Sequence, residues 1–194
     1  MTPRARDAAL FVGGCAALAV SGALARRPGV SDAEERAFRA LNDLPDRLSP
    51  LLRTVMQGGT FGVVPAAAAV AALARRRRLA ATLAVSGTAA YVLGKIVKRP
   101  VGRPRPAALL PNVRLRGREE GDLGFPSGHA AVSAALTIAV WPHTDDRYRL
   151  AGLMLAGFVP FARMYVGAHL PLDALGGSAL GIAVGCLANL AGPK

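Results

Sequence analysis

The chain has 194 residues, of which 52% are hydrophobic and 5% aromatic, and it carries 24 Lys and Arg against 12 Asp and Glu. Its mean hydropathy is +0.34, and its apolar residues gather in long runs separated by arginines. The high apolar content excludes a disordered chain, and a total of two cysteines excludes a disulfide-stapled secreted module. Because aromatic residues are scarce and arginines flank apolar runs, we expect no nucleic-acid partner and predict a small polytopic membrane protein.

Six apolar runs are candidate membrane-spanning helices, since about 20 residues cross the ~30 Å hydrocarbon core of a bilayer. Their richness in Ala and Gly suits close packing between helices in a membrane. The sequence therefore predicts one all-α domain, residues 1–194, with six transmembrane helices and its functional site at one membrane face. The predicted helices are, in chain order, residues 8–25, 54–74, 79–97, 127–141, 150–166 and 171–191.

The first apolar run has a second interpretation, a cleavable signal peptide. Arg4 and Arg6 would form its charged region, and residues 23–25 resemble a small-residue cleavage site. The run is longer than the roughly 7–15 apolar residues of a signal peptide, which favours a retained helix.

The polar segment that follows predicts a surface helix over residues 31–44. Ser31 and Glu34 match the S-x-x-E capping box, in which the Ser side chain caps the helix and the Glu side chain reaches back. Apolar residues then recur at helical spacing beside arginines. Such a helix can pack on the bundle or lie in the headgroup layer, and the sequence leaves both possibilities open.

Four consecutive arginines, Arg75–Arg78, lie in the short connection between the second and third predicted helices. Short, positively charged loops favour the cytoplasmic side of a membrane. Basic residues are more numerous on the opposite face, but many of them lie in residues 95–118, where they can serve chemistry. We therefore predict a multi-pass protein of the plasma membrane with both termini in the cytoplasm.

Three polar clusters interrupt the apolar sequence, at residues 98–106, 125–129 and 162–173. They follow the third predicted helix, open the fourth, and connect the fifth to the sixth. Alternating topology brings all three to one membrane face, which is extracytoplasmic if the termini are inside.

The clusters together predict an anion-binding pocket that contains two histidines. Arg presents a bidentate fork that matches phosphate oxygens, and helix N-termini direct N–H groups at anions. Asp173 follows His169 by four residues, so its carboxylate can hold one ring nitrogen and leave the other free to attack phosphorus. His129 can then protonate the departing oxygen. The cationic residues of the pocket are Lys98, Arg103, Arg105 and Arg163.

Each of these residues also has a structural interpretation. Arg163 and Asp173 could form an ion pair within the bundle, since charges at membrane depth are usually paired. Lys95 and the outer arginines could bind lipid headgroups. Ser127 is placed to cap the fourth predicted helix.

The order and spacing of these residues resemble the three motifs of the membrane-bound type 2 phosphatidic acid phosphatases, relatives of the soluble bacterial acid phosphatases and vanadium haloperoxidases. The motif core spans residues 98–173, and Ala162 stands where the family usually has Ser. The matching residues are Lys98 with Arg105-Pro106 for K-x6-R-P, residues 126–129 for P-S-G-H, and Arg163, His169 and Asp173 for S-R-x5-H-x3-D.

The resemblance implies a mechanism as well as a family. It implies that His169 is the nucleophile that forms a phosphohistidine, that Asp173 orients it, and that His129 is the acid that later activates water. It also implies that no metal or other cofactor takes part. The phosphate-binding residues that it implies are Lys98, Arg105, Arg163, Ser127 and Gly128.

We therefore expect an integral membrane lipid phosphatase with no obligate protein partner. Its candidate substrates are a polyprenyl diphosphate, phosphatidate, phosphatidylglycerophosphate or a polyprenyl-phosphate sugar phosphate. A non-catalytic protein that binds anionic lipids is the alternative, although it would not need His129, His169 and Asp173 in register. A vanadate-dependent oxidase would share the motifs, but such relatives are soluble and larger.

Overall fold

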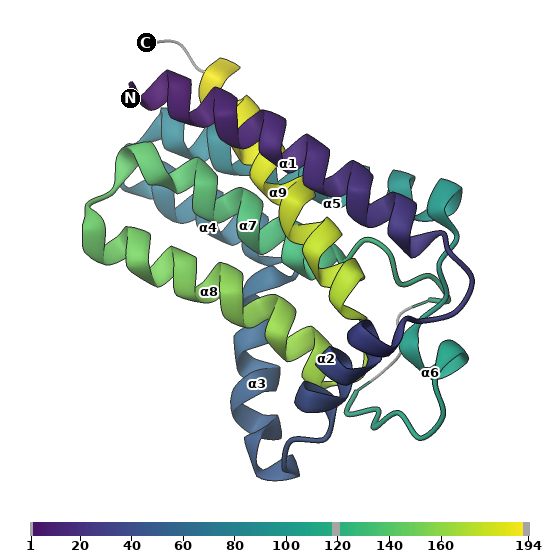
Figure 1. Cartoon of the computed structure of the whole chain (residues 1–194). Coiled ribbons are helices and arrows are strands. Elements are labelled where there is room, and N and C mark those ends of the chain that lie inside the picture. Colours follow the sequence, from purple (N-terminus) through teal and green to yellow (C-terminus); the bar gives the residue numbers. More distant parts are fainter. Residues whose placement is uncertain (1, 118–120, 192–194) are drawn as a thin grey trace.

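The computed structural model describes residues 2–117 and 121–191, and every regular element within these ranges is helical (Figure 1). The helices are α1 (Pro3–Ala25), α2 (Asp32–Asn42), α3 (Ser49–Met56), α4 (Val63–Leu73), α5 (Arg77–Val101), α6 (Pro106–Leu109), α7 (Gly128–Val140), α8 (Asp146–Tyr165) and α9 (Pro171–Ala191). Single 3₁₀ turns occupy Asp46–Leu48, Gln57–Gly59 and Trp141–His143. The long helices form one bundle with the start of α1 and the end of α9 at one end, whereas α2 and α6 lie at the other end (Figure 1).

The predicted all-α class is confirmed, and five of the six predicted long helices appear with ends shifted by only a few residues. The predicted surface helix also forms, as α2. Its Phe38 is fully buried and packs with Leu110 and Leu170, on the connections that precede α7 and α9. In this structure α2 therefore packs on the bundle, which is one of the two possibilities that the sequence left open.

The predicted continuous helix over residues 54–74 is instead broken into α3 and α4, which meet at an angle of 66°. Glycine is a poor helix former, and Gly58, Gly59 and Gly62 all lie in or beside the break. A Cβ atom on Gly59 would lie only 2.5 Å from the carbonyl oxygen of His129. The break therefore lets the backbone of this segment contact the first turn of α7.

Three helices, α1, α5 and α9, are each long and apolar enough to cross a membrane, and the bent α3–α4 pair would be a fourth span. α7 has 13 residues, which rise about 20 Å and fall short of the ~30 Å hydrocarbon core. Large apolar side chains project outward from the bundle, as contact with lipid requires. Examples are Val12 on α1, Val70 on α4, Val85 on α5 and Leu187 on α9.

The two connections nearest the termini contact each other and the N-terminal helix. The side chain of Arg76, between α4 and α5, donates a hydrogen bond of 2.5 Å to the carbonyl of His143, between α7 and α8. The guanidinium of Arg6 lies 5.6 Å from the centre of the Trp141 ring. The arginine-rich turn, the α7–α8 connection and the N-terminus thus share one end of the bundle.

Small residues allow α9 to pack unusually closely against α7. A Cβ atom on Gly177 would lie 2.2 Å from the carbonyl oxygen of Ser127, and one on Gly181 would lie 2.2 Å from that of Ala131. Real Cβ atoms do not approach backbone oxygens so closely. The two helices therefore meet backbone to backbone.

We expect Gly181→Ala to destabilise the fold, because the added methyl group must push α7 and α9 apart, and such overpacking typically costs about 1–3 kcal/mol. The matched control is Gly157→Ala in α8, where an added Cβ meets no atom within 4 Å. The control should unfold at the same temperature or slightly higher, because Ala is the better helix former. Thermal unfolding in detergent measures both variants, and equal midpoints for them would contradict the close packing.

Candidate active site

A cavity of about 400 Å³ lies between the end of α5, the first turn of α7 and the connection from α8 to α9, where the three polar clusters converge. Ser127 and Asp173, which the sequence also predicts as site residues, are completely buried and do not line it. The predicted site residues that line the cavity are Lys98, Arg105, Gly128, His129, Arg163 and His169.

Lys98 reaches the cavity from the last turn of α5. The helix ends just beyond it because Gly102 adopts a left-handed conformation, with φ of 65°, and donates its N–H to the Lys98 carbonyl. The Lys98 ammonium donates hydrogen bonds to the carbonyls of Leu123 and Gly124, at 2.9 and 3.1 Å. Lys98 therefore ties the segment that leads into α7 to the end of α5.

Two buried arginines complete the cationic wall of the cavity. Arg105 donates from Nε to the Gly121 carbonyl at 2.6 Å and from Nη1 to the Ala168 carbonyl at 2.9 Å. Arg163 lies in the last turn of α8, and its Nη1 atom is 3.8 Å from the sulfur of Met56. Backbone carbonyls and burial thus hold the guanidinium of Arg105, and burial against α3 positions that of Arg163.

The N-terminus of α7 lies directly beside the cavity. Ser127 occupies the N-cap position as predicted, but its side chain makes no capping hydrogen bond. Instead, its backbone N–H donates to the Asp173 carbonyl at 2.9 Å, which joins the start of α7 to the first turn of α9. Because the Ser127 hydroxyl accepts no hydrogen bond from the first N–H groups of α7, these groups, next to Gly128 and His129, can bind an anion.

His169 and Asp173 lie close together, as their spacing predicts. The distance from His169 Nδ1 to Asp173 Oδ2 is 3.7 Å, which exceeds a hydrogen bond. Asp173 Oδ2 accepts a hydrogen bond of 2.9 Å from the backbone N–H of Leu170. The carboxylate is therefore positioned beside the imidazole but held by the α8–α9 connection.

Burial, followed by the positive charge of Arg163, lowers the pKa of His169 well below its usual value of 6.5. Both effects disfavour the imidazolium. At neutral pH the ring is uncharged and keeps the nitrogen lone pair that a nucleophile needs.

The possible ion pair between Arg163 and Asp173 does not form, because Asp173 pairs with Arg103 instead, at 3.2 Å. The sequence placed Arg103 among the cations of the pocket, but the structure buries it behind the cavity against Glu34. The predicted capping box is only half correct. The Ser31 hydroxyl accepts the Glu34 N–H at 3.3 Å, whereas the Glu34 carboxylate binds Arg103 because a bidentate pair with a guanidinium is stronger.

Several residues that the sequence analysis did not assign to the pocket also line the cavity. Gly59–Phe61 enter it through the break between α3 and α4, and Tyr91, Gly94 and Lys95 enter from α5. The Lys95 ammonium lies 4.4 Å from the centre of the Tyr91 ring, which stacks on Phe61. Helical spacing was the available signal, since positions 91, 95 and 98 share one helix face.

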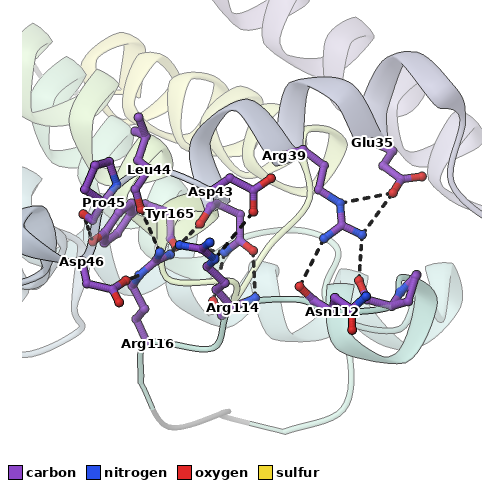
Figure 2. A network of polar contacts seen from close by, with 12 residues as sticks. Glu35, Arg39, Asp43, Leu44, Pro45, Asp46, Asn112, Arg114, Arg116 and Tyr165 are labelled. Carbon is purple, nitrogen blue, oxygen red and sulfur yellow. Dashed lines mark hydrogen bonds and ion pairs between the residues drawn. The ribbon is translucent and has the colours of Figure 1, made fainter.

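A polar network fixes the segment between α6 and α7 against α2 and the end of α8 (Figure 2). The Arg116 guanidinium lies 4.2 Å from the centre of the Tyr165 ring and donates to the carbonyls of Asn42 and Leu44, at 2.7 and 2.9 Å. The buried Asn42 amide donates to the carbonyls of Arg114 and Tyr165, both at 3.0 Å. The segment that follows Arg105 is therefore anchored at two points.

A helical membrane bundle that places two histidines, two lysines and two arginines around one cavity is the arrangement expected of a membrane-embedded phosphatase. The comparisons agree with this assignment. Residues 63–194 match the model of the PAP2 superfamily, and the chain belongs to that superfamily.

Curated relatives include phosphatases of prenyl lipids. The chain is 29% identical over 124 residues to an undecaprenyl-diphosphatase of Sulfolobus acidocaldarius, a match that covers 64% of this chain and 60% of the relative. It is 31% identical over 125 residues to the decaprenylphosphoryl-5-phosphoribose phosphatase of Mycobacterium tuberculosis, covering 62% and 66%. The matched region thus spans about 60% of the length of the archaeal relative.

Two solved structures share the fold. Aquifex aeolicus LpxE superposes with a TM-score of 0.70 at 21% identity, covering 83% of this chain and 98% of that one. A PAP2-type phosphatidylglycerolphosphate phosphatase of Bacillus subtilis superposes with a TM-score of 0.67 at 19% identity, covering 94% of each chain.

Proposed function

We propose that the protein hydrolyses a phosphate monoester or diphosphate of a membrane lipid at this cavity. The observation that carries the proposal is that His129 and His169 line the same cavity as Lys98, Arg105 and Arg163. A protein that only binds anionic lipids needs the cations but not two histidines among them. The relatives named as lipid phosphatases support the same conclusion.

The reaction proceeds in two steps. His169 attacks phosphorus while the bond from phosphorus to the leaving oxygen breaks, and His129 donates a proton to that oxygen. The products are a phosphohistidine on His169 and the leaving group, which is the lipid alcohol from a monoester or the lipid monophosphate from a diphosphate. His129 then takes a proton from water, the water oxygen attacks phosphorus, and the nitrogen–phosphorus bond breaks to release inorganic phosphate. Asp173 orients His169 and stabilises its imidazolium.

The cationic side chains supply the charge that phosphoryl transfer needs. Lys98, Arg105 and Arg163 bind the nonbridging phosphate oxygens, and the N-terminus of α7 assists through Ser127 and Gly128. Among the described residues, no group of three or more His, Cys, Asp or Glu side chains is arranged to hold a metal ion. Because Lys98, Arg105 and Arg163 can supply the positive charge that a metal ion would otherwise provide, we propose metal-independent hydrolysis.

Among the candidate substrates, Lys95 favours a lipid diphosphate, such as a polyprenyl diphosphate. Its side chain lines the cavity one helical turn before Lys98. When Lys98 binds one phosphate of a diphosphate, Lys95 can therefore bind the adjoining phosphate. Phosphatidate, phosphatidylglycerophosphate and a polyprenyl-phosphate sugar phosphate remain candidates. The archaeal undecaprenyl-diphosphatase is consistent with the preference for a diphosphate.

We further propose six membrane crossings in the plasma membrane, with α1, the α3–α4 pair, α5, α7, α8 and α9 as the spans. The termini and the arginine-rich α4–α5 turn share one end of the bundle, and short positive loops favour the cytoplasm. The cavity, at the other end, then faces the extracytoplasmic side.

His169→Ala should abolish phosphate release, because it removes the nucleophile, and His129→Ala should slow turnover by about 10²–10⁴-fold, the usual contribution of a general acid. His143→Ala is the matched control, since His143 lies outside the cavity at the other end of the bundle. Phosphate released from a panel of lipid phosphates measures all three variants. Full activity of His169→Ala would overturn the assignment, and activity lost in EDTA but restored by Mg²⁺ would overturn metal independence.

Lys95→Gln should lower kcat/KM for a prenyl diphosphate by about tenfold or more relative to that for the monophosphate, since a hydrogen bond to a charged group is lost. Arg99→Gln removes the same charge from an exposed position of α5 outside the cavity and should leave the ratio unchanged. Equal ratios in the two variants would mean that Lys95 does not contact the second phosphate.

Sidedness is testable with a protein in which Cys15 and Cys186 are replaced by Ala. A cysteine at the exposed Asn112, at the cavity end, should react with an impermeant thiol reagent on intact cells. A cysteine at the exposed Asp145, at the terminal end, should react only after the cells are opened. The reverse pattern would place the active site in the cytoplasm.

A further inference from the structure

A buried arginine connects the α5–α6 segment to two carboxylates from distant parts of the chain. Arg103 Nη1 donates to Glu34 Oε1 at 2.9 Å, and its Nη2 donates to Glu34 Oε2 at 2.6 Å. The same Nη1 donates to Asp173 Oδ1 at 3.2 Å. The three side chains are no more than 8% exposed, and none of them lines the cavity.

Glu34 also contacts α9 directly. Its Oε1 accepts the backbone N–H of Leu172, at 2.9 Å, in the first turn of that helix. Glu34 thus holds the start of α9 at two points, directly through the Leu172 N–H and indirectly through Arg103, which pairs with Asp173. The first turn of α9 cannot rotate without breaking one of these contacts.

The two carboxylate oxygens of Asp173 therefore accept hydrogen bonds from different partners. Oδ1 accepts from Arg103, while Oδ2 accepts from the Leu170 N–H and lies 3.7 Å from the His169 ring. Burial tends to lower the pKa of Arg103, but the Glu34 and Asp173 carboxylates outweigh it and raise the pKa, so that the guanidinium stays charged. Because Glu34 occupies the fork of the guanidinium, Arg103 offers Asp173 a single contact and cannot pair bidentately with it.

We propose that Glu34 and Arg103 are positioning residues for the Asp173–His169 pair, and that they act on the chemical step rather than on substrate binding. This inference rests on the proposed function. Without Glu34, Arg103 is free to turn its fork toward Asp173 and draw the carboxylate away from His169. A buried ion network of this kind is costly to form, and replacing it with apolar residues is often neutral for stability. Because Asp173 links this network to His169, the network can position the imidazole in addition to stabilising the fold.

The test is Glu34→Gln, which keeps the shape of the side chain and removes its charge. We expect kcat to fall by about 100-fold, as for a small misplacement of a reacting group, with KM unchanged. The inhibition constant of orthovanadate, which takes the five-coordinate geometry of phosphoryl transfer, should rise with the fall in kcat. That of inorganic phosphate should not change, because the cavity-lining cations are intact.

The matched control is Glu35→Gln, the next residue of α2, whose carboxylate forms a partly exposed pair with Arg39 at 3.1 Å. It removes the same charge without contacting Arg103 and should keep wild-type kinetics. Arg103→Lys keeps the positive charge but cannot make the bidentate contact with Glu34, and it should also lower kcat. If Glu34→Gln unfolds at a lower temperature than the wild type, the kcat of Arg103→Lys is the measurement that tests the inference. An unchanged kcat in a folded Glu34→Gln or Arg103→Lys, or a loss confined to KM, would overturn the inference. Inactive wild-type protein, in contrast, would overturn the proposed function itself.

Discussion

The backbone contact between α7 and α9 determines where both histidines lie. Gly177 allows the Ser127 carbonyl to touch α9, and the Ser127 N–H donates to the Asp173 carbonyl. His129 follows Ser127 by two residues, and His169 precedes Asp173 by four. The relative position of the two imidazoles therefore depends on the α7–α9 contact, although His169 itself lies in the connection between α8 and α9. A side chain at Gly177 would push the two helices apart.

A second constraint is electrostatic, because an anion site must exclude carboxylates. The described residues that line the cavity include no Asp or Glu, although two buried carboxylates lie nearby. Arg103 pairs with both Glu34 and Asp173, and none of these three side chains lines the cavity. In the proposed mechanism Arg103 is therefore not a ligand for phosphate but the ion-pair partner of the carboxylate that lies beside His169.

The sequence was sufficient to predict what depends on local pattern and spacing. Apolar runs located the long helices, and the four-residue spacing of His169 and Asp173 predicted that their side chains lie close together, which they do at 3.7 Å. It failed where a distant contact decided the outcome. Gly59, beside the break, packs against the backbone of His129, and the Glu34 carboxylate binds Arg103 instead of the start of its own helix. No short-range pattern in the sequence reveals either partner. The sequence also predicted that Arg103 lines the pocket. Its side chain instead points toward Glu34 and Asp173, two partners that lie far from it in the sequence.

The parts of the site that escaped prediction come mostly from the N-terminal third of the chain, outside residues 63–194 that match the superfamily model. Glu34 supports Asp173, Asn42 anchors the segment after Arg105, and Gly59–Phe61 form a wall of the cavity. In the proposed mechanism the motif residues supply the groups that react, whereas this segment aligns them and forms part of the cavity wall. Changes in it can therefore alter substrate preference or rate while every motif residue stays in place.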